Sequence, residues 1–310
     1  MNLTDLRKNG ALGVSLAGAA TLIVMFMLVL VFYLIFSGGF PALEWSFLSE
    51  YPREANMAGG ILPAIVGTSV MTIFMTILVV PIGVITALYL SEYAPKGVTR
   101  KLILTACNNL AGVPSIVFGL FGVGFFIHFV GGSIDNLFFA DKLPQPTYGT
   151  GGIMWAAMTM ALLTLPVVVV SSVEAMRRIP DDHRQASVAL GATRWQTVYR
   201  VVIPGAIPGI LTGVVLAVSR GVGEVAPIML LGAVKQVQEL PLALNSKFMH
   251  LGFHIYDLAC QSPNPQKAMP MVYATATVLL SIILILNSLI IFLRHKQRKK
   301  SGIVSLTGNF

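Results

Sequence analysis

The chain has 310 residues, of which 55% are hydrophobic and only 11% charged, whereas a typical soluble domain is about 25% charged. A chain this apolar cannot bury its hydrophobic surface inside one water-soluble globule, which excludes an ordinary soluble enzyme and indicates an integral membrane protein. The formal net charge of +8 is then better explained by membrane topology than by binding to nucleic acid.

Six apolar runs are long enough to cross a bilayer, whose hydrocarbon core takes about 20 helical residues. The runs are continuously apolar, unlike the short alternating strands of a membrane β-barrel, so we expect helices. The predicted fold class is an all-α integral membrane protein with six transmembrane helices. The runs cover residues 14–36, 63–90, 102–130, 151–172, 205–232 and 271–293.

Residues 1–62 are expected to contain the N-terminal tail, the first span and an outer loop. Arg7 and Lys8 precede the first run as they would in a signal peptide, but the run is too long for that, so an uncleaved signal anchor is expected. If the N-terminus is cytoplasmic, 15 Lys and Arg residues fall in cytoplasmic segments and five in outer loops. Both termini are therefore predicted to be cytoplasmic, including the basic tail 294–310.

The core is expected to span residues 63–293 and to include one long polar loop, 173–204. Pro180 followed by two acidic residues favours the start of a helix in this loop, and Gly191 favours its end. Thr193 and Gln196 then fit the capping box that opens a second helix. The loop is predicted to form a short helix, a tight turn and another helix.

Two sets of residues in this loop are suited to docking on a partner. The first set is small enough to enter a groove: Ala186, Ser187, Ala189 and Gly191. The second set offers positive charge to the rim of a contact: Arg184, Arg194 and Arg200. The alternative is a loop that folds only against its own bundle.

Arg220 lies near the centre of the predicted fifth span, and Glu224 lies one helical turn further toward the outside. A charge at a helix centre costs about 2.5 to 3.5 kcal/mol on insertion scales, so such residues usually face a protein interior or a wet path. The spacing places both on one helical face as a pair. Two interpretations stay open: a structural ion pair between subunits, or a translocation path in which Arg220 attracts an anion and Glu224 holds Arg220 and keeps the anion from binding too tightly.

The sequence offers no catalytic residues, and no cofactor is expected on this chain. It contains no Gly-x-x-x-x-Gly-Lys-[Ser/Thr], His-Glu-x-x-His or Gly-x-Ser-x-Gly motif. His250 and His254 could share a helical face, but no third ligand is indicated, which favours an ordinary interfacial face over a metal site. Any energy source is therefore expected on another chain.

The polar loop resembles the EAA motif of bacterial ABC-importer permeases, which reads Glu-Ala-Ala, then Gly, then an apolar-Pro ending. The corresponding positions here are Gln185, Ala186 and Ser187, then Gly191, then Ile203 and Pro204. The resemblance implies a type I ABC-importer permease fold whose short helix docks on a nucleotide-binding subunit. Because Gln185 is uncharged where the family has Glu, docking is expected to depend on shape at that position.

Three further stretches resemble the phosphate-transport permeases, and the PstA type more than the PstC type. They are residues 90–94, 108–122 and 219–227. The resemblance implies one membrane subunit of an ATP-driven phosphate importer. Its implied partners are a second permease subunit (PstC-like), a dimer of ATPase subunits (PstB-like) that binds ATP and Mg, and a phosphate-binding protein (PstS-like).

Other functions remain as alternatives. Within the same class, the transported anion could be sulfate or molybdate. From another class, Arg220 and Glu224 could serve an ion channel or a membrane-embedded hydrolase. A hydrolase would need a nucleophile with a base or metal ligands, and a self-sufficient channel would not need a docking loop.

Overall fold

The structure is a computed structural model that describes residues 3–300, except 55, 57, 96, 238 and 242. Lys96, one of the predicted cytoplasmic charges, and residues 301–310 of the predicted tail lie outside the described residues. Helices make up nearly all of the regular structure, with one small hairpin.

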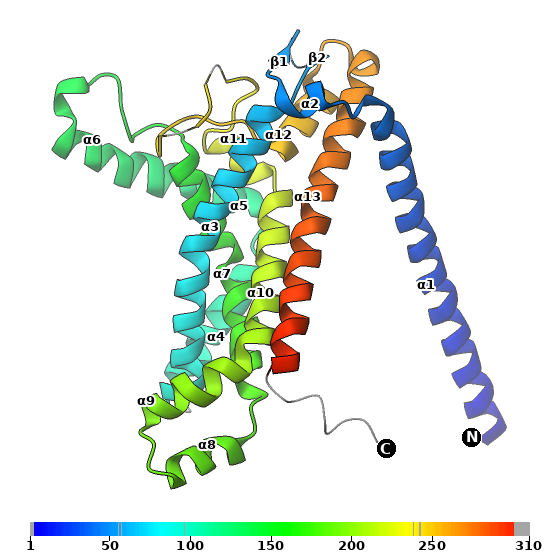
Figure 1. Cartoon of the computed structure of the whole chain (residues 1–310), viewed down its shortest axis with the longest axis vertical. Helices are drawn as coiled ribbons and strands as arrows, with labels where there is room; N and C mark the ends of the chain where they lie inside the picture. The colour runs from blue at the N-terminus through cyan, green and yellow to red at the C-terminus, as the bar shows by residue number, and fades with distance from the viewer. Residues whose placement is uncertain are drawn as a thin grey trace.

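Long helices form a membrane bundle, and several of the short ones lie at its two ends (Figure 1). The α-helices are α1 (Leu3–Gly39), α2 (Trp45–Ser49), α3 (Leu62–Leu88), α4 (Val98–Ala111), α5 (Ser115–Phe121), α6 (Gly132–Phe138), α7 (Ile153–Arg177), α8 (Asp181–Ala189), α9 (Arg194–Thr197), α10 (Ile203–Gly223), α11 (Ala226–Leu230), α12 (Leu251–Tyr256) and α13 (Pro265–Lys300). The antiparallel hairpin pairs β1 (Pro52–Arg53) with β2 (Ala58–Gly59). π-helical turns occupy Tyr89–Tyr93, Gly122–Gly131, Val198–Val202 and Asp257–Gln261.

Six helical stretches in the described part of the chain are long and apolar enough to span a membrane, as the sequence predicts. They are Gly13–Ala42, Leu62–Tyr93, Ser115–Phe138, Ile153–Arg177, Arg194–Gly223 and Pro265–Lys296. α7 is the central one, because it packs against α3, α10, α4 and α5 and is the most buried of the six. The apolar surface of the other spans is left for lipid or for partner subunits.

The predicted third span, 102–130, is wrong at its start. Its first part is a separate helix, α4, which ends at Ala111, and the spanning stretch begins only at Ser115. Pro114 explains the break, because proline has no backbone N–H and disfavours a helical conformation at the residue before it. Hydropathy does not detect this break, since the residues on both sides are apolar.

The predicted fifth span, 205–232, is shifted along the sequence. The helical path begins at Arg194, runs through the π-helical turn Val198–Val202 and ends at Gly223. The π-helical turn accommodates the backbone bond that Pro204 cannot donate to the preceding turn. Glu224 follows in an extended conformation, with φ −77° and ψ 139°, so it is not part of the helix.

The two ends of the bundle differ in what they carry (Figure 1). The start of α1, the end of α13 and the helices α8 and α9 lie at one end, and β1, β2, α2 and α12 lie at the other. Because the start of α1 and the end of α13 lie at the same end, the arrangement fits a chain that crosses the membrane an even number of times. That the end with α8 faces the cytoplasm remains a prediction from the positive charges.

The contacts seen between α1 and the rest of the described chain lie near the C-terminal end of α1. Gly38 and Gly39 approach Tyr273 and Thr277 of α13 closely, and the Thr277 hydroxyl donates a hydrogen bond to the carbonyl of Ile35 at 3.2 Å. Toward its other end α1 diverges from the bundle, and its apolar side chains are exposed (Figure 1).

Candidate translocation and coupling sites

Arg220 and Glu224 form an ion pair, with 3.3 Å between Arg220 Nε and Glu224 Oε1. The predicted pairing is present, but it joins the last turn of α10 to the first residue after the helix, and not two turns of one helix. Both side chains are partly exposed within this chain. In the described residues no other partner is seen for Arg220, so its two terminal nitrogens keep donors available for an anion.

The helix that carries Arg220 is held close to its neighbours by small residues. A side chain at Gly209 would collide with Ala175 of α7, one at Gly213 with Ser171 of α7, and one at Gly221 with the sulfur of Met75 in α3. Close backbone approach of this kind is how transmembrane helices pack without a hydrophobic driving force. The packing fixes α10 against α7 and α3 and leaves Arg220 on a less covered face.

Two of the stretches that resemble phosphate-transport permeases meet beside this ion pair. A Cβ added to Gly119 in α5 would lie 2.8 Å from the Cα of Pro227 in α11, so only glycine permits this approach. α11 thus packs on α5, and this contact holds the segment that follows Glu224 in place. Asn108 and Asn109 lie elsewhere, on the exposed surface of α4.

The polar loop has the local structure that its sequence predicts. α8 begins directly after Pro180, and Gly191 follows it with φ +82°. The amides of Gly191 and Ala192 donate to the carbonyls of Val188 and Ser187, which is the Schellman pattern of helix termination. Thr193 and Gln196 form the predicted capping box at the start of α9.

Arg184 anchors the inner face of α8, so its placement corrects the expectation of a charge on the rim. Its guanidinium contacts both oxygens of Glu92, from Nη2 at 3.0 Å and from Nε at 3.3 Å. It also donates to the carbonyls of Met176, at 2.9 Å, and Ile179, at 2.5 Å, beyond the end of α7. One side chain therefore links α8 to the ends of both α3 and α7.

Glu92 is the functional candidate that the sequence analysis did not single out. It lies in the π-helical turn after α3, and besides Arg184 it accepts a bond from Arg194 through its backbone carbonyl. The Arg194 guanidinium also lies 5.1 Å from the centre of the Tyr93 ring, a cation–π contact. The available signal was a single carboxylate directly after an apolar run, in a loop whose other charges are all positive.

The outer face of α8 stays open. Gln185, Ala186 and Ala189 are exposed, and Leu190 is 90% exposed, which is unusual for so large an apolar side chain. The Ser187 hydroxyl, by contrast, is bonded to that of Thr197 at 3.0 Å, and this bond joins the two short helices.

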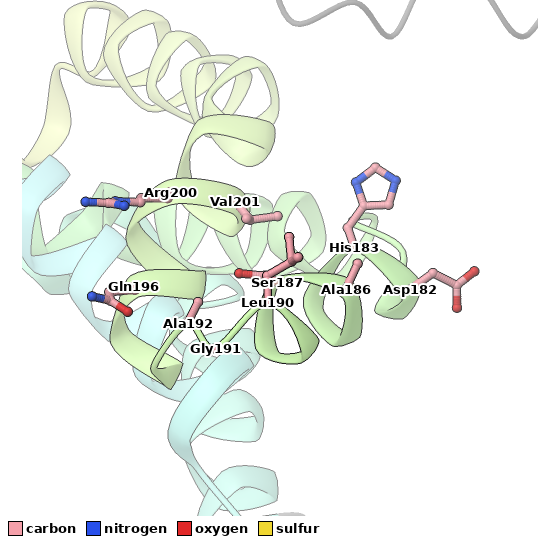
Figure 2. Close-up of a pocket in the computed structure, with 10 residues that line it drawn as sticks. All are labelled: Asp182, His183, Ala186, Ser187, Leu190, Gly191, Ala192, Gln196, Arg200 and Val201. Carbon is pink, nitrogen blue, oxygen red and sulfur yellow. The ribbon is translucent and has the colours of Figure 1, made fainter.

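A cleft of ≈ 850 Å³ lies between α8 and the helical segment that follows it (Figure 2). Small side chains line its middle, and Arg200 and Gln196 lie on the α9 side (Figure 2). Three of the four predicted small residues, Ala186, Ser187 and Gly191, border this cleft, whereas Ala189 and Arg184 do not line it.

His250 and His254 are buried, in contrast to the interfacial position that their spacing indicates. Burial lowers the pKa of each to about 4, although Asp257 opposes the shift at His254. His250 Nδ1 accepts a bond from the amide of Gly252, and both ring nitrogens of His254 lack a partner in the described residues. No group of three metal-ligating side chains occurs among the residues that the structure describes.

Solved structures with the same architecture are importer permeases. A chain of a bacterial alginate ABC transporter matches with a TM-score of 0.63 at 16% identity, over 96% of this chain and 98% of that one. A chain of the MetNI methionine ABC transporter matches with a TM-score of 0.54 at 18% identity, over 77% of this chain and 94% of that one. The fold is that of an ABC-importer permease.

The family model for "Binding-protein-dependent transport system inner membrane component" matches residues 79–299. The chain belongs to that family and is a multi-pass protein of the inner membrane, a transport subunit and not an enzyme.

Relatives by sequence carry names from phosphate transport. The phosphate transport system permease protein PstA 1 of Mycobacterium tuberculosis is 36% identical over 57% of this chain and 52% of its own length. The chain thus spans about half the length of the first of these relatives. PstA of Haemophilus influenzae is 27% identical over 94% of this chain and 96% of its own length, and PstC of Mesorhizobium japonicum is 29% identical over 66% of each.

Proposed function

We propose that this chain is one permease subunit of an ATP-driven phosphate importer and forms half of the translocation path. The names of relatives that match along much of the chain support phosphate as the substrate. The observation that carries the proposal is the Arg220 guanidinium, which Glu224 holds through one nitrogen while the other two remain available. Such donors suit an oxyanion through charge-assisted hydrogen bonds.

The coupling part of the proposal concerns α8. The exposed small residues of α8 and the cleft beside them suit insertion into a groove on an ATPase subunit, which would bind ATP and Mg. ATP binding closes the ATPase dimer and moves α8, and the Arg184–Glu92 contact passes this movement to the ends of α3 and α7. A second permease subunit completes the path, and a phosphate-binding protein delivers the anion from the other side.

Uptake by purified assemblies tests the proposal. Proteoliposomes that contain all subunits are expected to accumulate labelled phosphate only with ATP, and unlabelled phosphate should compete while sulfate and molybdate do not. Equal competition by sulfate or molybdate would assign the chain to another oxyanion. Leakage of ions without ATP would favour a channel.

The variant Arg220→Gln tests the site itself. We expect uptake to be abolished, because glutamine stays polar but lacks the positive charge that attracts the anion. Arg178→Gln, at an exposed position after α7, is the matched control and should transport normally. Near-normal phosphate flux in Arg220→Gln, with subunits assembled, would show that the ion pair is only structural.

A further inference from the structure

A groove of ≈ 240 Å³ lies between α10 and α13, away from the sites described above. Its lining is mostly apolar, and Leu216 and Ile291 are more than half exposed. Besides Arg294, the lining residues are Thr212, Val215 and Leu216 from α10 and Asn287, Ile290 and Ile291 from α13. Arg294 closes one end. The groove thus combines a mostly apolar surface on two spanning helices with a single cation.

Arg294 stands where the apolar part of α13 ends. The preceding stretch, 289–293, is entirely apolar, and His295 and Lys296 follow directly. In a bilayer this is the level at which hydrocarbon gives way to headgroups. The apolar walls of the groove therefore lie at the depth of acyl chains, and Arg294 lies at the depth of phosphates.

Among the described residues, no carboxylate pairs with Arg294. No Asp or Glu occurs anywhere from residue 258 to residue 310, and α10 contributes only Arg220 as a charged residue. In the part of the chain that the structure describes, Arg294 makes no ion pair or hydrogen bond. A phosphate stabilises a guanidinium at the edge of an apolar region, because it accepts two parallel hydrogen bonds from the guanidinium.

We propose that this groove binds one anionic glycerophospholipid, with an acyl chain between α10 and α13 and the phosphate on Arg294. The neighbouring positive charges of the chain end, which include Lys296, favour an anionic over a zwitterionic headgroup. The lipid bridges the two helices beside the hydrogen bond that Ser219 donates to Asn287 at 2.6 Å. It therefore stabilises the contact between α13 and the helix that carries Arg220.

Native mass spectrometry of the purified assembly tests this proposal, with phosphatidylglycerol and phosphatidylcholine of identical acyl chains as the probes. One phosphatidylglycerol per chain should be retained in a saturable way. Arg294→Gln should weaken its binding about tenfold or more, the size expected for a charge-assisted pair. Lys296→Gln, which removes an adjacent charge outside the groove, should weaken it about fivefold at most.

A second pair of variants tests the apolar part and does not alter charge. Leu216→Trp fills the groove and should abolish saturable retention, whereas Ile285→Trp, at an exposed position of α13 outside the groove, should not. Equal retention of phosphatidylcholine, or equal losses in Arg294→Gln and Lys296→Gln, would overturn the proposal. A disulfide from Thr212→Cys to a second membrane subunit would also overturn it, because that subunit would then occupy the groove.

Discussion

At the candidate coupling site, single charged side chains join several helices at once. Arg184 is the best example, because its guanidinium meets Glu92 and the carbonyls of Met176 and Ile179 at once. Both partners of the ion pair are largely buried, so removing one leaves the other charge without compensation. We therefore propose that Glu92 contributes to the proposed coupling by holding Arg184.

The variant Glu92→Gln should uncouple ATP hydrolysis from uptake. Loss of the carboxylate frees α8 from the end of α3, so we expect uptake to fall about tenfold while ATPase activity persists, as for the loss of a partly buried ion pair. Arg184→Gln should be more severe, because it also removes the bonds to the end of α7. Parallel measurement of phosphate flux and ATP hydrolysis checks this, and an unchanged ratio of the two in Glu92→Gln would contradict it.

At the scale of elements, α8 and α9 were predictable because their signals are local. Pro180, Gly191 and the Thr193–Gln196 box each fix the backbone within a few residues, and each is found as expected. The anchor between Arg184 and Glu92 joins residues far apart in the sequence, so no local pattern indicates it. The starts of the third and fifth spans were misplaced because hydropathy averages across Pro114 and does not register a helix that begins in a polar loop.

Cross-linking tests the proposed role of α8 as the element that contacts the ATPase. With Cys107 and Cys260 replaced by serine, Ala189→Cys should cross-link to the ATPase subunit, because Ala189 lies on the open face of α8. Ala140→Cys is the matched control, since it is equally exposed but belongs to the opposite end of the bundle. If Ala189→Cys in intact assemblies never captures the ATPase, the coupling proposal fails.

At the scale of the whole molecule, the end opposite α8 is held by a small polar cluster. Asp257 binds Lys235 Nζ at 2.6 Å and accepts a bond from Asn56 Nδ2 at 3.3 Å, which ties the hairpin region and the loop after α11 to the turn after α12. His250 and His254 are buried beside this cluster in their neutral form. Protonation of these histidines would place charge in an apolar environment.

This burial predicts a loss of stability in acid. The pKa of each histidine is about 4 in the folded protein and about 6.5 when unfolded, so the unfolded state binds more protons between these values and stability falls as pH drops below about 6.5. Together the two histidines should lower the free energy of unfolding by on the order of a few kcal/mol near pH 5. His254→Phe removes a ring that has no partner in the described residues.

The Tm measured at pH 7.5 and pH 5.5 checks this expectation. The drop between the two values should be clearly smaller in His254→Phe than in the unmodified protein. His183→Phe, at an exposed position on α8, serves as the control and should leave the drop unchanged. Identical drops in Tm in all three proteins would show that the buried histidines do not cause the loss of stability in acid.

The unbroken helical path from Arg194 to Gly223 has a mechanical consequence. Its 30 residues make a rod about 45 Å long, and a tilt of about 5° about its centre displaces each end by about 2 Å. Arg220 belongs to this rod and moves with it. Glu224 lies after the helix, in the segment that leads to α11, and α11 packs on α5. If the pair binds an anion as proposed, a modest tilt imposed at one membrane surface would be enough to part the two charges near the other and so to change how Arg220 holds that anion.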